Sequence, residues 1–183
     1  MKITFLFLNL FIGIMLFLQC KENDNSRNSL LVRDEVRILS NEEYGDLSNS
    51  ILDLKNRLGC EIAILIVDST GPKTIEEYSF DYFEKWKFGR KYYNDGLLII
   101  VAINDRKVRI EVGYGLEKII RDEVAAIIIK EKMIPDFRKG NYFDAIKQGL
   151  DSIKSLIIQN QNLIGDQEGI NSRWDKIKDK IKK

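Results

Sequence analysis

The chain has 183 residues, with 29 basic and 28 acidic side chains, two cysteines and no histidine. This length allows one domain with a substantial core, and the near balance of charge gives no reason to expect nucleic acid as a partner. The lack of histidine excludes Ser-His-Asp and Cys-His catalysis and the common zinc sites, so any metal would need oxygen ligands, which suit calcium, magnesium or manganese.

The first residues have the pattern of an export signal. Ile3 to Leu18 is an apolar run, too short for a comfortable membrane span, that follows Lys2 and ends just before Cys20. We expect residues 1–19 to be a lipoprotein signal peptide, Cys20 to be the lipidated first residue, and residues 20–30 to form a polar tether. This predicts a membrane-anchored lipoprotein of the bacterial cell envelope, on the periplasmic or surface face. A cleaved secretory signal with an incidental cysteine, and an uncleaved anchor, are the alternatives.

The segment after the tether predicts a short strand, a helix and a second strand. Ser40 and Glu43 have the spacing of a capping box. Apolar residues at spacings of three and four then predict an amphipathic helix that ends at Gly59. Glu61–Val67 is nearly all apolar, which is typical of a strand buried on both faces. Cys60, which precedes this strand, is predicted to be a small core residue rather than a nucleophile.

The middle of the chain predicts a helix followed by a β-hairpin. Thr74 and Glu77 form a second capping box, and the helix that follows has an aromatic face. Basic and aromatic residues interleave over residues 85–93, either as a surface for phosphate groups or a partner, or as core aromatics with a solvated lysine face. Leu97–Ile103 carries no charge and predicts a central strand. Lys107–Val112 alternates between apolar and charged residues and predicts a half-exposed outer strand.

Two further helices complete the predicted domain. Asp122 is expected to cap the first, which Pro135 stops or follows. The second runs from about Tyr142 to Ile158 and has one apolar side. We therefore predict an α/β fold, a single sandwich over residues 31–158, with a mixed sheet of about four strands and helices on both faces. The second and third strands are expected to be parallel, joined by a right-handed crossover.

The end of the chain, residues 159–183, predicts a linker and a basic amphipathic tail. Residues 173–183 contain six basic and two acidic residues, a local charge of plus four. Such a segment can lie at the surface of an anionic membrane. A helix docked on its own domain, and a frayed end, are the alternatives. The tail's apolar residues recur at spacings of four, three and four: Ile170, Trp174, Ile177 and Ile181.

The open ends of the hairpin form the first candidate site. They lie side by side in an antiparallel pair, and their glycines let the backbone approach a ligand closely. Carboxylates beside them offer hard oxygens for calcium or magnesium, and a small anion is a second option. The alternatives are ordinary turns and an N-cap. The predicted loop residues are Asn94, Gly96, Gly113 and Gly115, and the predicted metal ligands are Asp95, Glu117 and Asp122.

The second candidate site lies at the opposite edge of the predicted sheet. Asp68 follows one parallel strand, and Asn104, Asp105 and Arg106 follow the next. Ligands often bind at the carboxyl ends of parallel strands. The alternative is that these residues only form the hairpin turn and a solvated loop.

The block from Asp95 to Glu117 resembles the signature of the TPM domain, a family of exported α/β modules. Further blocks of the sequence resemble the family and occur in the same order along the chain, among them Val32–Asp34 and Ile134–Arg138. The resemblance therefore covers roughly residues 31–158. It implies the same α/β architecture as the periodicity does.

The resemblance also implies two functions. The first is a non-catalytic binding or accessory module that binds a membrane or envelope protein and is ordered by a divalent cation. The second is a divalent-metal-dependent phosphatase of low specificity, in which the three carboxylates hold metal and Lys118 or Arg121 lies near the phosphate. We favour the binding module, because the sequence has no phosphate-cradling glycine loop, no nucleophile motif and no histidine acid.

Overall fold

The computed structural model describes residues 31–165, so the predicted signal peptide, Cys20, the tether and the tail from residue 166 lie outside the described residues. Four strands form one sheet in the order β1–β2–β3–β4. β1 and β3 both pair with β2 in parallel, and β4 pairs with β3 in the antiparallel sense. This confirms the predicted mixed sheet and the parallel second and third strands. The strands are β1 (Val32–Asp34), β2 (Glu61–Val67), β3 (Gly96–Ala102) and β4 (Lys107–Val112).

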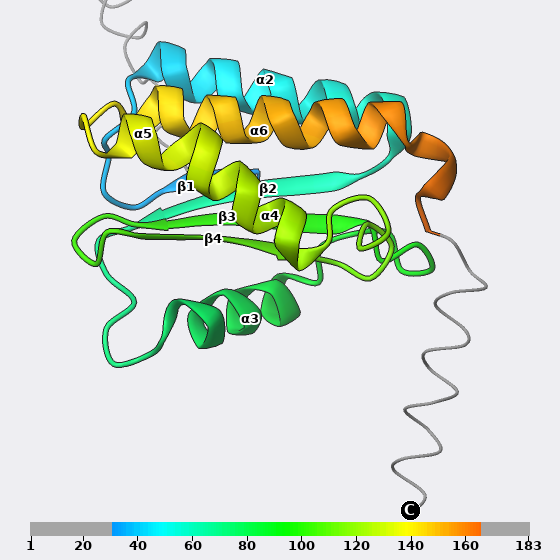
Figure 1. Ribbon diagram of the computed structural model, residues 1–183, viewed down its shortest axis with the longest axis horizontal. Coiled ribbons are helices and arrows are strands. Elements are labelled where there is room, and N and C mark those ends of the chain that lie inside the picture. Colours follow the sequence, from blue (N-terminus) through cyan, green and yellow to red (C-terminus); the bar gives the residue numbers. More distant parts are fainter. Residues whose placement is uncertain (1–30, 166–183) are drawn as a thin grey trace, which may run out of the picture.

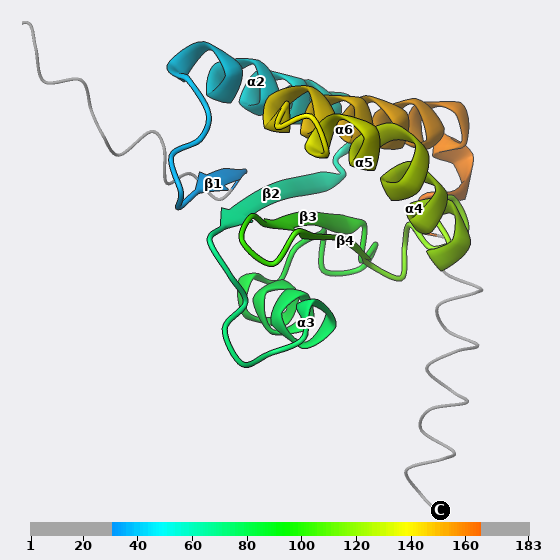
Figure 2. The same ribbon diagram turned by 60° about the vertical axis from the view of Figure 1, so that its left-hand side comes forward.

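Helices cover both faces of the sheet, as predicted (Figure 1). One helix, α3, lies alone on one face, while α2, α4, α5 and α6 lie on the other, an arrangement that the turned view repeats (Figure 2). Across residues 31–165, no helix is long and apolar enough to span a bilayer. The helical segments are α2 (Asn41–Leu58), α3 (Ile75–Trp86), α4 (Asp122–Ile128), the π-helical η2 (Ile129–Met133), α5 (Ile134–Phe137), α6 (Tyr142–Gln159) and the short 3₁₀ segment η3 (Gln161–Leu163).

The sheet separates two apolar cores, which explains why β2 and β3 show no alternation of polar and apolar residues. Ile62, Ile64 and Ile66 of β2 belong to the larger core beneath α2 and α6. Ala63 and Leu65 point to the other face, where they pack against the aromatic side of α3. A central strand that is buried on both faces has no solvent side on which a polar residue would be favoured.

Local signals set both ends of α2 and the start of α3, as predicted. Both capping boxes form: Ser40 accepts a hydrogen bond from the Glu43 N–H, and Thr74 accepts one from the Glu77 N–H. Gly59 ends α2 with a left-handed φ of 80°, and its N–H donates to the Lys55 carbonyl at 2.8 Å. Each cap satisfies backbone groups that the helix itself leaves unpaired.

The helix after the hairpin differs from the prediction at its start. Its N-cap is Arg121, without a side-chain capping bond, and Asp122 is the first helical residue. Asp122 is therefore placed to interact with the helix dipole rather than to bond the first N–H groups. α4 ends at Ile128, so Pro135 follows its end, which was one of the two predicted alternatives, and the chain runs on through η2 into α5. Pro135 lies in the first turn of α5, where a missing N–H is tolerated.

Candidate functional site

Asp95, the first of the predicted metal ligands, is fully buried and bonded to Arg90. The Arg90 backbone N–H donates to Asp95 Oδ1 at 2.8 Å. The Arg90 guanidinium donates to Oδ2 through Nε at 2.8 Å and through Nη2 at 2.5 Å. These side-chain bonds also raise the pKa of Arg90 above its ordinary value. The carboxylate thus fixes the loop that leads into β3, and a cation of the protein itself neutralises its charge.

The glycines of the predicted ligand loops allow backbone to pack on backbone. A Cβ added at Gly113 would lie 2.3 Å from the Asn94 carbonyl oxygen, and one at Gly115 would lie 1.8 Å from the Tyr93 carbonyl oxygen. The Gly115 N–H donates to the Asn94 carbonyl at 2.9 Å. The two loops therefore lie side by side, and a neighbouring loop takes up the space that the missing side chains leave.

The three predicted metal ligands do not converge. Glu117 is half-buried in the turn after β4, and Asp122 is exposed at the start of α4. Lys118 and Arg121, the predicted phosphate partners, are exposed between them. No three acidic, cysteine or histidine side chains within residues 31–165 form a group that could hold a metal ion. Cation binding at this edge stays a prediction. Asp95 already forms an ion pair with Arg90.

At the opposite edge, two carboxylates join the loops that follow β2 and β3. The Asn104 side-chain amide donates to Asp68 at 2.7 Å. The Ser69 hydroxyl and the Thr70 N–H each donate to Asp105 at 2.8 Å. The Thr70 N–H and the Ser69 hydroxyl hold the pKa of Asp105 below its ordinary value, because they stabilise the charged form. These bonds fix the shape of the hairpin turn from one side.

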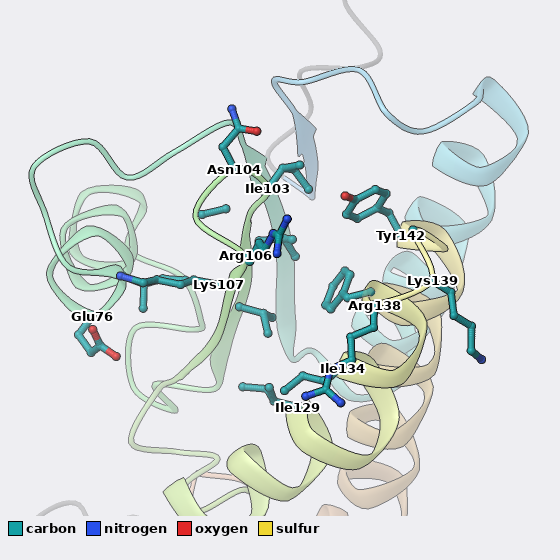
Figure 3. Close-up of a pocket in the computed structure, with 16 residues that line it drawn as sticks. Glu76, Ile103, Asn104, Arg106, Lys107, Ile129, Ile134, Arg138, Lys139 and Tyr142 are labelled. Atoms are coloured by element: carbon teal, nitrogen blue, oxygen red, sulfur yellow. The ribbon is translucent and has the colours of Figure 1, made fainter.

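Arg106 occupies the strained position of this turn. Its φ is 54°, in the left-handed region that residues other than glycine and asparagine rarely adopt. The Arg106 N–H closes the turn on the Ile103 carbonyl at 3.1 Å. In Figure 3 the side chain lies between the strands and Tyr142. A strained residue held by its surroundings is a reason to suspect a function at that position.

An open groove of about 1130 Å³ lies beside the turn. The hairpin forms one wall, and the segment from η2 to the start of α6 forms the other (Figure 3). Ile103, Ile134 and Phe137 contribute apolar lining, and Tyr142 adds a hydroxyl. The charged residues that line the groove are Glu76, Arg106, Lys107, Arg138 and Lys139.

Four cations line the groove, and Arg106, Lys107 and Arg138 among them are exposed. Lys139 points away from the groove in Figure 3 and pairs with Asp136 at 2.9 Å. Arg106 and Arg138 have no acidic partner among residues 31–165, and Lys107 is exposed at the rim. The groove therefore combines an apolar floor with a net positive charge, a surface suited to an anionic group next to an apolar one.

The far wall of the groove depends on close helix packing. Gly149 of α6 leaves room for Met133 of η2, because a Cβ there would lie 2.7 Å from the Met133 sulfur. The π-helical turn that contains Met133 leads directly into α5. π-Helical turns often occur at functional sites. Here the turn holds Ile134 and Arg138 over the hairpin.

The groove includes residues that the sequence did not single out. Of the second candidate set, Asn104 and Arg106 line it, while Asp68 and Asp105 hold the loops behind it. In the sequence, Arg138 stood out only as the end of a block of the TPM resemblance, and Tyr142 only as the start of a predicted helix. Their nearness to the hairpin turn depends on tertiary packing, which no local pattern encodes.

Residues 32–156 of the chain match the TPM domain. Among solved structures, the N-terminal domain of a protein from P. gingivalis is 30% identical, with a TM-score of 0.66 over 70% of this chain and 82% of that one. The BA42 protein from Bizionia argentinensis is 20% identical, with a TM-score of 0.59 over 72% and 88%. The N-terminal domain of a Corynebacterium glutamicum protein is 12% identical, with a TM-score of 0.56 over 70% and 79%, and these last two likenesses show the fold alone. No curated protein matches the chain.

Proposed function

This chain belongs to the TPM domain family, since more than half of it matches, and we propose that it is an exported, lipid-anchored envelope module that binds a protein partner. Cys20 carries the lipid in this proposal, and residues 20–30 tether the domain to the membrane. The bound element is an acidic segment of the partner that also carries an apolar residue. Its site is the groove beside Arg106.

The observation that carries this proposal is the groove itself. Arg106 and Arg138 stand on opposite walls, one on the hairpin turn and one after α5. An arginine presents a planar fork of donors that matches a carboxylate and gives stronger hydrogen bonds than neutral pairs. Between them, the apolar floor suits a leucine-like side chain. Charge complementarity of this kind sets specificity and association rate more than total affinity.

A labelled peptide in which glutamates flank a leucine tests the groove. Fluorescence anisotropy measures its dissociation constant with the wild type and with Arg106→Gln and Arg138→Gln. We expect each variant to weaken binding on the order of fivefold, and added salt to weaken it further. The matched control is Arg57→Gln, an exposed arginine of α2 that pairs with Asp53. Equal affinity in all four proteins would remove the groove as the site.

A phosphatase is the second candidate function, and the same two arginines favour it, because cations stabilise the charge on a transferring phosphoryl group. Hydrolysis of p-nitrophenyl phosphate with calcium or magnesium measures it. If the reaction takes place at the edge that holds Glu117 and Asp122, with a metal-bound water as predicted from the sequence, Glu117→Gln and Asp122→Asn would abolish turnover. If it takes place in the groove, Arg106→Gln would lower turnover and the two carboxylate changes would leave it unaltered. Turnover that survives these changes and also survives Arg106→Gln would come from a contaminant. A calcium titration of the same variants tests the predicted cation independently.

A further inference from the structure

Three tyrosines are exposed together at the end of the domain opposite the groove. Tyr92 is 72% exposed, Tyr93 42% and Tyr114 47%. They come from the loop before β3 and the loop after β4, which the bond from the Gly115 N–H to the Asn94 carbonyl holds together. We call this surface the tyrosine end. Six large apolar side chains are exposed within residues 31–165, and the three tyrosines are half of them. The six are Leu52, Phe80, Tyr92, Tyr93, Tyr114 and Ile127.

The tyrosine end also carries positive charge on Lys91, whose ammonium lies 5.7 Å from the Tyr92 ring centroid. The Arg90 guanidinium stacks 3.9 Å from the Tyr93 ring centroid, and its charge is balanced by Asp95. The described chain ends at the same place, because the Gly165 N–H donates to the Gly115 carbonyl at 2.9 Å (Figures 1 and 2). The 18 residues that follow start from here, and residues 173–183 carry a charge of plus four.

We propose that the tyrosine end is a docking surface for an anionic lipid bilayer. Tyrosine is enriched at membrane–water interfaces, where its ring meets acyl chains and its hydroxyl meets water. Basic residues beside such rings are attracted to anionic headgroups. This proposal rests on the proposed function in one respect, because the lipid anchor keeps the domain beside a bilayer. What it adds is the face of the domain that contacts the lipid.

This orientation has a consequence for the groove. The tyrosine loops adjoin the starts of β2 and β3, and the groove lies past their carboxyl ends. Strands of seven residues span roughly 23 Å. With the tyrosine end on the membrane, the groove faces away from the bilayer, where a partner's acidic segment can reach it.

Single labelled cysteines test the proposal in the full chain reconstituted into vesicles. An environment-sensitive fluorophore is attached at Tyr92→Cys and Tyr114→Cys, with Phe80→Cys as the matched control, an aromatic of α3 that is 56% exposed but lies away from this end. Burial raises the pKa of the Cys60 thiol to about 12 and keeps it unreactive, and the chain without an added cysteine gives the background. Vesicles contain phosphatidylcholine alone or with 30% phosphatidylglycerol (about one anionic lipid in three).

In anionic vesicles we expect the labels at 92 and 114 to shift to the blue and to be quenched by spin-labelled lipids, while the label at 80 is quenched by aqueous iodide. If the chain floats with the vesicles but all three labels respond equally to iodide, the docking surface is wrong while the anchor stands. If the chain does not float, both proposals fail.

A second measurement avoids labels. Tyr92→Ser combined with Tyr114→Ser should lower the protection of loops 90–95 and 113–116 from hydrogen exchange in anionic vesicles on the order of tenfold, relative to Phe80→Ser. Tyr93 is left unchanged, because its ring supports Arg90 and fills the space in which a Cβ at Gly165 would lie. Equal protection in the two variants would count against the tyrosines, and equal protection in neutral and anionic vesicles would count against the charge.

Discussion

Replacement of Asp95 by asparagine should destabilise the fold, because the carboxylate has a structural partner. The side chain has no solvent exposure, and it accepts three hydrogen bonds from Arg90. Loss of one member of a fully buried pair costs about 3–5 kcal/mol. The Arg90 side chain is 38% exposed, so its charge can return to water, and asparagine keeps an oxygen for the Arg90 N–H. We therefore expect Asp95→Asn to lower the free energy of unfolding by about 2 kcal/mol.

Replacement of the other member of the pair, Arg90, should lower the free energy of unfolding further. Arg90→Gln leaves a fully buried carboxylate without its cation, and we expect a loss of about 3–4 kcal/mol. Arg90 also stacks on Tyr93, so part of this loss is packing rather than charge. The double variant separates the two, since a double-mutant cycle cancels the packing contribution. Its coupling energy should be about 2 kcal/mol.

Urea unfolding of the four proteins, followed by circular dichroism, measures these differences. The matched control is the exposed pair of Arg57 and Asp53 on α2, whose atoms lie 3.5 Å apart. The same cycle on that pair should give less than about 0.5 kcal/mol. An Asp95→Asn protein that unfolds like the wild type but no longer binds calcium would refute this reasoning and make Asp95 a ligand.

Three further outcomes follow from single contacts. Ser40→Ala should lower the free energy of unfolding by about 1 kcal/mol, and Asp122→Ala by less than about 0.5 kcal/mol, because only Ser40 makes a capping bond. The urea unfolding midpoints of the two variants and the wild type measure this difference. Gly115→Ala should cost more than about 2 kcal/mol through its collision with backbone, whereas Gly45→Ala, with open space around it on α2, should stabilise by about 0.5–1 kcal/mol; a reversed order would contradict the packing argument. The lowered pKa of Asp105 stabilises the fold above the unfolded pKa of about 3.9, and this contribution is lost as the pH falls through the folded value; Asp105→Asn should therefore show a shallower loss of stability in acid titrations below about pH 4.

The elements of this fold could be predicted from the sequence because their signals are local. The apolar runs of β2 and β3 and the alternation in β4 record which faces are buried. Both capping boxes join residues only three positions apart. The prediction was wrong where two neighbours compete: Arg121 or Asp122 could each precede the helix, and the path of the incoming loop decides which one caps it.

The candidate sites depended on tertiary structure to a greater degree. Sequence pattern by itself determined that polar residues gather at both edges of the sheet, because strand ends must meet turns there. It could not decide that Asp95 faces Arg90 rather than a ligand, since that depends on how deeply the loop before β3 is buried. Nor could it place Arg138 beside Arg106, because the 31 intervening residues must first pack a helix across the sheet. Strand ends are fixed by short-range patterns, whereas the neighbours of a side chain across a groove are fixed only when the layers of the fold close on one another.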